Sequence, residues 1–359
     1  MRVHNFCAGP CTLPVSVLEE VRSELLDLEG SGMSVIEMSH RSPKYEALHD
    51  EALTLFRENF SVPGDFSILF LQGGATLQFA LVPMNLLGDG DRAGYVRSGT
   101  WGKGALKDAT TCGDAYAAWD GEPVSYTRMP SDDELEIRPG TRYLHVTSNE
   151  TIEGIRMAAF PGVEVPLVGD MSSDYLSRPI PWERFDLVYG GAQKNLGPAG
   201  LAVVVVRTSV LEQTNRELPS YLRLDAHAGK NSLMNTPPMF AIYVTGKVLR
   251  WMRDLGGVDA MADRAARRSG AVYRAIEESD GFYRSPVERA HRSHMNVVFR
   301  TPSEELDAAF LAGATDERLV NLKGHRSVGG IRASIYNAMT DEGVDALVGF
   351  MSTFRNANG

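Results

Sequence analysis

The stretch Tyr189-Gly190-Gly191-Ala192-Gln193-Lys194-Asn195-Leu196-Gly197-Pro198-Ala199-Gly200 follows an apolar run at residues 185–189 that reads as a buried strand. It places one lysine, Lys194, in a glycine-rich loop directly after that strand. Lysine is costly to bury, but its amine becomes a nucleophile toward aldehydes when desolvation and neighbouring charges lower its pKa. The position of Lys194 therefore indicates Schiff-base chemistry.

A carboxylate follows a second apolar strand upstream. The run at residues 163–168 leads directly into Gly169-Asp170-Met171. In an open parallel sheet, ligands bind at the carboxyl ends of the strands. A lysine that can hold an aldehyde and an aspartate that can pair with a pyridinium nitrogen are the two protein groups that pyridoxal phosphate requires. Lys194 and Asp170 together predict a site for that cofactor.

Length and composition are typical of a globular enzyme with more than one core. The chain has 359 residues, more than a single core usually supports, with 43% hydrophobic and 23% charged residues. We expect no membrane span, because no apolar run is long enough, and a cytoplasmic location, because the first residues do not resemble a secretory signal. A formal net charge of -10 argues against nucleic-acid binding.

The three cysteines predict neither disulfides nor a metal site. Cys7, Cys11 and Cys112 are an odd number, and no second Cys or His pair completes a zinc pattern around the first two. We interpret them as small buried residues of a protein from a reducing compartment.

The order of predicted elements indicates an α/β fold with a largely parallel sheet. Short β-rich runs alternate with segments of helical length, and two helices then lead into a smaller region with two further strands and a closing helix. The predicted strands are residues 68–71, 94–96, 143–146, 165–168, 186–189, 201–206, 295–300 and 331–335, and the predicted late helices are residues 239–255, 260–278 and 341–354.

Two further motifs suit anions, although each has an ordinary structural alternative. The loop Gln72-Gly73-Gly74-Ala75-Thr76 lies between a strand and a helix, where free amides can bind a phosphate, but a tight turn explains the glycines equally well. Residues 318–340 contain cations and no acid, which predicts a site for a small anion, with a solvated basic face as the alternative. Trp101 could stack on a flat ring or could belong to the core.

Seven segments, in order, resemble the phosphoserine aminotransferase family, which is a class-V, fold-type I group of pyridoxal-phosphate enzymes. The resemblance covers nearly the whole chain. The segments are Asn5-Phe6-Cys7-Ala8-Gly9-Pro10, Glu37-Met38-Ser39-His40-Arg41, Gly73-Gly74-Ala75-Thr76-Leu77-Gln78-Phe79, Ser148-Asn149-Glu150-Thr151-Ile152-Glu153-Gly154, Gly191-Ala192-Gln193-Lys194-Asn195-Leu196-Gly197-Pro198-Ala199-Gly200, Asn235-Thr236-Pro237-Pro238 and Lys323-Gly324-His325-Arg326-Ser327-Val328-Gly329-Gly330-Ile331-Arg332-Ala333-Ser334.

The resemblance implies an architecture and an assembly. It implies a large cofactor-binding domain at residues 13–257 with a mostly parallel seven-stranded sheet flanked by helices. A smaller α+β domain would follow at residues 258–359, with residues 1–12 packed on it. The family also implies a homodimer with shared active sites.

The resemblance assigns cofactor roles to nine residues. Lys194 would hold the cofactor and move the proton, and Asp170 would pair with the ring nitrogen. The other implied contacts are ring stacking by Trp101, a bond from Thr151 to the phenolic oxygen, and phosphate contacts from Ala75, Thr76 and Gln193, with Asn235 and Thr236 reaching the phosphate from the partner subunit. Thr76 departs from members that have an arginine there, so the phosphate would depend more on amides.

The basic residues acquire substrate roles by the same resemblance. Arg332 would bind the substrate α-carboxylate, a task that suits a planar bidentate donor. The distal phosphate or carboxylate would be bound by His40, Arg41, His325 and Arg326. The implied reaction moves the amino group of glutamate to 3-phosphohydroxypyruvate, giving O-phospho-L-serine and 2-oxoglutarate in L-serine biosynthesis. The family often also accepts 4-phosphohydroxy-L-threonine in pyridoxine biosynthesis.

Three other functions fit the sequence less well. A cysteine desulfurase needs a nucleophilic cysteine in the C-terminal part, and the sequence has none after Cys112. A serine:glyoxylate type of transaminase shares the fold but has no need of the cations at His325 and Arg326. A non-catalytic cofactor-binding protein would dispense with Lys194 and Arg332.

Overall fold

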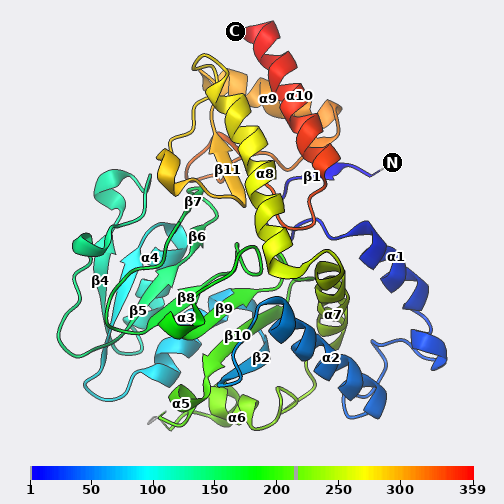
Figure 1. The fold of residues 1–359 in the computed structure, drawn as a ribbon, viewed down its shortest axis with the longest axis vertical. Coiled ribbons are helices and arrows are strands. Elements are labelled where there is room, and N and C mark those ends of the chain that lie inside the picture. Colours follow the sequence, from blue (N-terminus) through cyan, green and yellow to red (C-terminus); the bar gives the residue numbers. More distant parts are fainter. Residues whose placement is uncertain (1, 214–216) are drawn as a thin grey trace.

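The fold is that of a computed structural model, which describes residues 2–213 and 217–359. A seven-stranded sheet forms the centre of the lower, broader part of the molecule in the order β2-β10-β9-β8-β5-β3-β4 (Figure 1). Its strands are β2 (Phe66–Gln72), β3 (Arg92–Arg97), β4 (Asp114–Asp120), β5 (Thr141–Thr147), β8 (Leu167–Asp170), β9 (Phe185–Gly191) and β10 (Leu201–Arg207).

The sheet is parallel except at one strand. The pairs β3–β4, β3–β5, β5–β8 and β8–β9 are parallel, whereas β10 is antiparallel to both of its neighbours, β9 and β2. The register joins Asp170 to Tyr189, so the ends of β8 and β9 lie at the same edge of the sheet. This arrangement confirms the predicted α/β class with a mostly parallel seven-stranded sheet.

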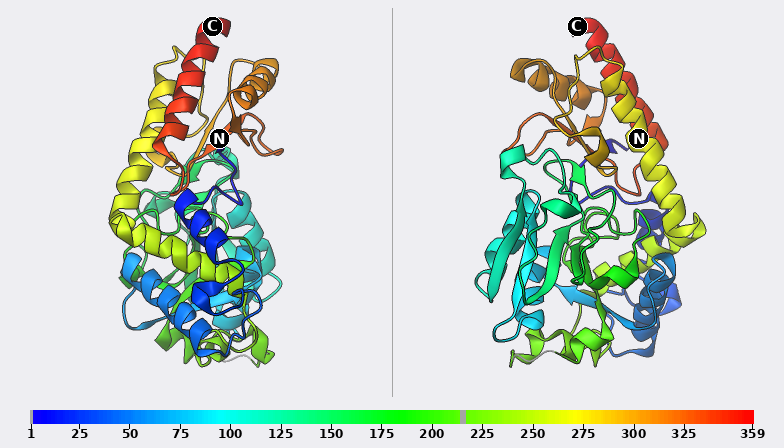
Figure 2. Two further views of the ribbon diagram at one scale, coloured as in Figure 1. Left: turned by 90° about the vertical axis from the view of Figure 1, so that its right-hand side faces the viewer. Right: turned by 60° about the vertical axis from the view of Figure 1, so that its left-hand side comes forward.

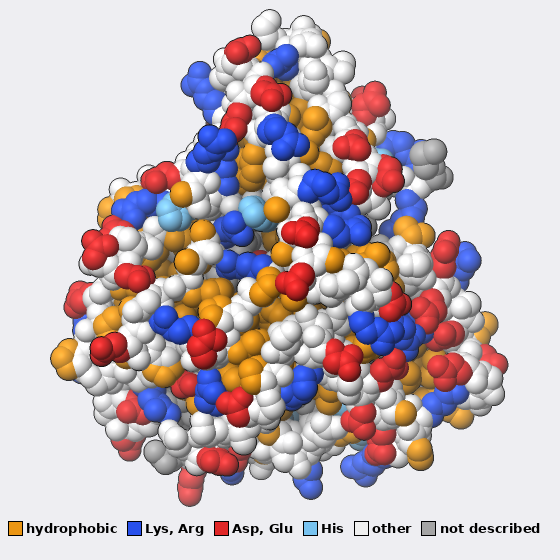
Figure 3. Space-filling view, in the orientation of Figure 1, with side chains coloured by type: hydrophobic (Ala, Val, Ile, Leu, Met, Phe, Trp, Pro, Cys, Tyr) orange, Lys and Arg blue, Asp and Glu red, His pale blue; other side chains and the backbone are white. Residues whose placement is uncertain are grey.

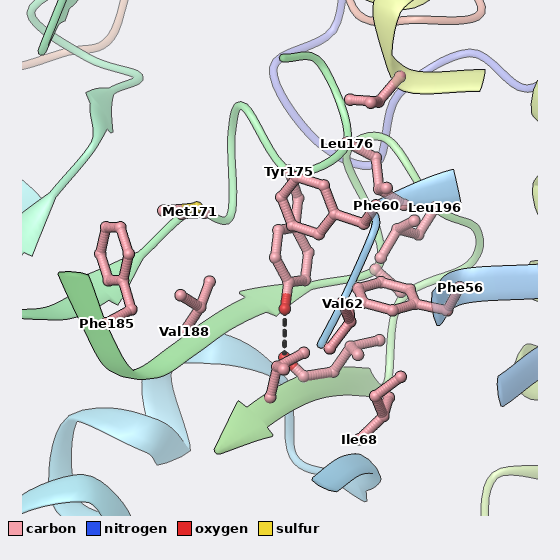
Figure 4. Packing of buried hydrophobic residues seen from close by; sticks show 14 of the residues in the cluster. Phe56, Phe60, Val62, Ile68, Met171, Tyr175, Leu176, Phe185, Val188 and Leu196 are labelled. Carbon is pink, nitrogen blue, oxygen red and sulfur yellow. Dashed lines mark hydrogen bonds between the residues drawn. The ribbon is translucent and has the colours of Figure 1, made fainter. Parts of the chain in front are cut away.

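Apolar residues on both faces of the strands make two cores. Along β10, Val203 and Val205 point into one core and Val204 and Val206 into the other, because successive side chains of a strand alternate between faces. Figure 4 shows the first core, in which the Tyr175 hydroxyl donates a hydrogen bond of 3.5 Å to the carbonyl oxygen of Val203. A sheet covered on both faces explains why these strands read as continuous apolar runs.

Helices cover both faces and give three layers. Side chains of α3 and α4 contribute to one core, and side chains of α2 and α7 contribute to the other. The helix α1 packs against α7 at the outside of that layer. The helices of this part are α1 (Val15–Glu24), α2 (Pro43–Asn59), α3 (Gly74–Leu86), α4 (Thr100–Ala109), α5 (Thr208–Leu211), α6 (Leu224–Ala228) and α7 (Met239–Asp254), and a short hairpin is formed by β6 (Asn149–Glu150) and β7 (Ile155–Arg156).

The upper part of the molecule has its own apolar core, built largely from the C-terminal residues. The two long helices α8 and α10 run side by side in both views of Figure 2. The N-terminal strand β1 (His4–Asn5) joins this part by pairing in parallel with β12. The other elements are α8 (Gly257–Glu277), β11 (Asn296–Phe299), α9 (Glu304–Asp316), β12 (Leu319–Val320), β13 (Ile331–Ser334) and α10 (Asp341–Asn358).

The predicted elements are present, with two differences. The edge strand β4 was not predicted, because its sequence Asp114-Ala115-Tyr116-Ala117-Ala118-Trp119-Asp120 is rich in alanine and has no β-branched residue, and it pairs on one side only. The reversed direction of β10 was not predicted either. Within the described residues, none of the helices is both long enough and apolar enough to span a membrane. The domain boundary at residues 257–258 stays a prediction.

Candidate active site

Lys194 lies in the tight connection that turns the chain from β9 back into the antiparallel strand β10. The amides of Leu196 and Gly197 donate to the carbonyl oxygen of Ala192 at 3.0 and 2.8 Å, which closes the turn. Gly200 adopts a φ of 103°, a conformation open to glycine and unfavourable for other residues. The glycine-rich sequence thus holds Lys194 at the edge of the sheet where β8 also ends.

The amine of Lys194 is buried among groups that can use it. Its Nζ donates a hydrogen bond of 2.7 Å to Thr151 Oγ1 and lies 5.7 Å from the centre of the Trp101 ring. Burial lowers the pKa of Lys194 to about 8, although the negative charges of Asp170 and Glu150 oppose the shift. A lysine in this condition has a substantial neutral fraction near neutral pH, which a nucleophilic amine requires.

Asp170 is the last residue of β8 and is only 4% exposed. Ser172 donates two hydrogen bonds to its Oδ1, from the backbone amide at 2.9 Å and from the hydroxyl at 2.6 Å. Burial raises the pKa of Asp170, whereas the bonds from Ser172 and the charge of Lys194 oppose the rise. Buried charges are stable only when paired, so this carboxylate is suited to a cationic partner within the site.

One cavity contains Lys194, Asp170 and the start of α3. Its polar lining includes side chains from four separate segments that the fold brings together at the edge of the sheet. The lining residues are Ala75, Thr76, Phe79, Trp101, Thr147, Asn149, Asp170, Ser172, Ser173, Gln193 and Lys194.

The donors around this cavity fit pyridoxal phosphate. The helix α3 begins after Gly73, which has a φ of 94° and provides no side-chain cap, so the first amides of the helix remain available to an anion. The cavity thus offers backbone amides that suit a phosphate at Ala75 and Thr76, a carboxylate that suits a protonated ring nitrogen at Asp170, and an amine that suits an aldehyde at Lys194. The Trp101 ring lines the same cavity, and its Nε1 is buried without a hydrogen-bond partner among the described residues.

Arg332 brings the upper part of the molecule to the same place. It lies on β13, and its Nη1 donates to the carbonyl oxygen of Thr151 at 3.4 Å. Burial lowers the pKa of Arg332, while its charge in turn disfavours the protonated form of Lys194. Thr151 therefore has a side-chain contact with Lys194 and a backbone contact with Arg332.

The loop before β13 carries the other predicted cations. His325 is half-buried and its Nδ1 lies 2.7 Å from the hydroxyl of Ser327, whereas Arg326 is exposed. Figure 3 shows Lys, Arg and His side chains gathered on one face, where the narrow upper part meets the broad lower part.

A second group of predicted site residues lies outside the cavity lining. Arg41, Asn235 and Thr236 are exposed, and His40 Nδ1 lies 3.3 Å from Thr236 Oγ1. The fold thus brings His40 and the segment at residues 235–236 together on the surface, but it does not place them among the residues that line the cavity with Lys194.

Several polar residues of the site were not predicted. Ser172 was not among the predicted residues, although it donates two hydrogen bonds to Asp170. Glu150 and Glu153 were quoted within a motif without a role, yet both are bonded to the start of α4. The available signal was the presence of two acids, Glu150 and Glu153, on either side of Thr151 directly after the predicted strand at residues 143–146.

Comparisons with known proteins agree with this geometry. Residues 3–347 match the family described as aminotransferase class-V. The chain is 47% identical over 359 residues to phosphoserine aminotransferase of Niallia circulans, covering 100% of this chain and 99% of the relative. It is 48% identical to that of Laribacter hongkongensis, with 100% of each chain covered.

Solved structures show the same similarity in three dimensions. Phosphoserine aminotransferase from Bacillus circulans subsp. alkalophilus superposes with a TM-score of 0.97 at 47% identity, covering 100% of this chain and 99% of that one. A phosphoserine aminotransferase with bound PLP from Trichomonas vaginalis has a TM-score of 0.94 at 36% identity, covering 98% and 100% of the two chains.

Proposed function

The chain belongs to the class-V aminotransferase family, and from this premise we propose that it exchanges an amino group between O-phospho-L-serine and 2-oxoglutarate with pyridoxal phosphate as cofactor. One observation carries the proposal. Lys194 and Asp170 line a single cavity, and Arg332 contacts Thr151, the residue that accepts the hydrogen bond of Lys194. A transaminase needs these three functions, an amine, a partner for the ring nitrogen and a clamp for the carboxylate, in one place.

Lys194 is the residue that holds the cofactor and moves the proton. When bound, pyridoxal phosphate supplies an aldehyde carbon and a conjugated ring that withdraws electrons from the α-carbon of the amino acid. With its pKa lowered to about 8, the Nζ of Lys194 would take the proton from the α-carbon of the amino acid and deliver it to the carbon that was the aldehyde of the cofactor. Thr151 Oγ1, 2.7 Å away, orients the amine.

Asp170 and Trp101 would fix the ring in position. The carboxylate of Asp170, held by Ser172, would accept a hydrogen bond from the protonated ring nitrogen and keep it charged. Trp101 would stack on the ring, and Thr151 would also contact its phenolic oxygen. Gln193 and the first amides of α3, at Ala75 and Thr76, would bind the phosphate.

The substrate has two anionic ends, and we propose that a different set of cations binds each end. Arg332 would hold the α-carboxylate through two parallel N–H donors. His325 and Arg326 would bind the distal phosphate of phosphoserine or the distal carboxylate of glutamate, together with His40 and Arg41. The phosphate and α-carboxylate of 4-phosphohydroxy-L-threonine would meet the same groups, so we propose it as a further substrate, in pyridoxine biosynthesis.

We also propose a homodimer with shared sites, in the cytoplasm. The segment at residues 25–41 exposes large apolar side chains, with Leu26 84% and Ile36 61% exposed. Contiguous exposed apolar residues are typical of protein interfaces. His40, Arg41, Asn235 and Thr236 lie at the surface beside one another, where they are available to the cavity of a second subunit.

The proposal is tested by turnover with matched substrates. Purified protein should convert phosphoserine and 2-oxoglutarate to glutamate, and serine at the same concentration should give at least about 100-fold lower kcat/KM, because it leaves a cationic pocket unpaired. Equal rates with serine and phosphoserine would contradict the assignment of the distal anion. Arg326→Leu should reduce the rate with phosphoserine much more than the rate with an amino acid that has no distal anion.

A further inference from the structure

Two glutamates, Glu150 and Glu153, cap the helix that carries Trp101. Glu150 accepts hydrogen bonds from the amides of Trp101 at 3.0 Å and Gly102 at 2.9 Å, and Glu153 accepts from the amide of Thr100 at 2.9 Å. The hydroxyl of Thr100 donates to the same oxygen of Glu153 at 2.7 Å. The positive end of α4 favours negative charge here.

The two carboxylates are neighbours. A Cβ added to Gly99 would lie 2.7 Å from the Cδ of Glu150 and 2.7 Å from the Oε2 of Glu153, so both groups approach the same point. Glu150 is fully buried, and burial together with the charge of Glu153 raises the pKa of Glu150 to about 8. Burial also raises the pKa of Glu153, whereas the hydrogen bonds from Thr100 and the charge of His325 oppose that rise. At neutral pH the pair therefore holds one negative charge more readily than two, and Glu153, the less buried of the two, is better placed to carry it.

Glu153 also borders the loop that carries the predicted substrate cations. Its Oε2 is buried and has no hydrogen-bond partner among the residues that the structure describes. Glu153 lines a cavity together with Ser327, Val328 and Gly329, which directly follow His325 and Arg326. The other charged side chain in that lining is Arg300, which donates a hydrogen bond to the carbonyl oxygen of Val328.

The charge of Glu153 acts on both ends of the proposed substrate pocket. The positive form of His325 favours ionised Glu153, and Glu153 in turn favours the charged form of Arg332. A carboxylate that balances these cations in the free protein must weaken the binding of a substrate whose two anionic groups bind to the same cations. The electrostatic repulsion from Glu153 is greater for a phosphate, which carries up to two negative charges, than for a carboxylate, which carries one.

We propose that Glu153 is a resident counter-anion of the substrate pocket, which balances His325 and Arg332 in the free protein and weakens the binding of the distal phosphate more than that of the distal carboxylate. This inference rests on the proposed function, since it assigns a specificity role within the same site. Glu153 would thereby keep the affinities for phosphoserine and for glutamate closer together than the cations alone would. An enzyme that must bind both in turn benefits from such a balance.

The test replaces Glu153 by Gln, which removes the charge but keeps an oxygen that can accept from Thr100. We expect Glu153→Gln to lower the dissociation constant for phosphoserine about threefold to tenfold, the scale of one partly buried charge acting on an anion. The affinity for glutamate should change less. Binding is measured by titrating the absorbance of the bound cofactor, and inorganic phosphate as a competitor should also bind more tightly.

Two controls separate charge from structure. Glu153→Asp keeps the charge, so it should bind phosphoserine no more tightly than the wild type does. Glu136→Gln is a matched change at a side chain that is 66% exposed and remote from the site, and it should leave both affinities unchanged. Unchanged or weaker phosphoserine binding in Glu153→Gln, or an equal gain in Glu153→Asp, would overturn the inference.

The outcomes also distinguish this inference from the proposed function. If the wild-type protein does not process phosphoserine, the proposed function fails whatever the variant does. If the wild type processes phosphoserine and Glu153→Gln binds it no more tightly, only the role of Glu153 falls. A lower KM for phosphoserine with kcat unchanged or reduced would support a binding role rather than a general loss of structure.

Discussion

The support of Asp170 by Ser172 yields a prediction whose size can be worked out. In Ser172→Ala the carboxylate keeps the backbone amide at 2.9 Å but loses the hydroxyl at 2.6 Å. A hydrogen bond to a charged group contributes about 1.5–3 kcal/mol to stability. Because the lost bond stabilises the ionised carboxylate, the pKa of Asp170 should rise further in the variant. The amide of Gly191 also loses its acceptor, which lies 3.2 Å away.

The loss of unfolding free energy in Ser172→Ala should depend on pH in one direction only. Burial already raises the pKa of Asp170 in the folded protein above its value in the unfolded chain, so Asp170 costs stability as pH rises through that interval. A further rise in Ser172→Ala widens the interval. The difference in unfolding free energy between wild type and variant should therefore grow or stay level between pH 6 and pH 9, and it should not shrink.

Urea unfolding of the cofactor-free proteins across this pH range measures the difference. Ser23→Ala is the matched control, because Ser23 is exposed and bonds only within α1, and it should change stability by less than about 0.5 kcal/mol. A loss below about 0.5 kcal/mol for Ser172→Ala at pH 8, or a loss that decreases as pH rises, would refute the reasoning.

Three shorter predictions follow from other parts of the structure. Lys194→Ala should fold and bind the cofactor without covalent attachment, as mass spectrometry after borohydride reduction would show, and appreciable turnover would contradict its role. Val204→Ala, at a fully buried position of β10, should lower the unfolding free energy by about 2–3 kcal/mol in urea melts, and a loss below about 1 kcal/mol would be inconsistent with its packing. Gly99→Ala should lower the melting temperature, because its Cβ would meet both Glu150 and Glu153, and an unchanged value would show that the two carboxylates move apart freely.

Much of the fold followed from local patterns. Buried strands such as β9 and β10 have continuous apolar sequences, and the alternation of strands and helices predicted a parallel sheet. The direction of β10 was not predictable from its own residues, since apolar content does not encode direction. It depends on the short connection around Lys194, which is too short for a crossover between parallel strands. The edge strand β4 is rich in alanine and has no β-branched residue, so its sequence does not favour a strand over a helix.

The site residues could be predicted where a charged side chain follows a buried strand, which is rare. They could not be predicted where the same residue type is also common in ordinary loops. A lysine and an aspartate at strand ends stand out, because burial of either is costly. Glu150 and Glu153 did not stand out, because acids in loops are common and only the fold shows that they bond to the start of α4. The places of Asn235 and Thr236 at the surface, away from the lining of the cavity, depend on tertiary packing.

The measurement that tests the central claim most directly is the visible absorption spectrum of the purified protein before and after addition of phosphoserine, with glutamate and serine as comparisons. We expect phosphoserine and glutamate each to remove the absorption band of the cofactor attached to Lys194, and we expect serine at the same concentration to leave it unchanged. A band that responds to serine alone, or a cofactor-loaded protein whose band responds to none of the three, would contradict this claim.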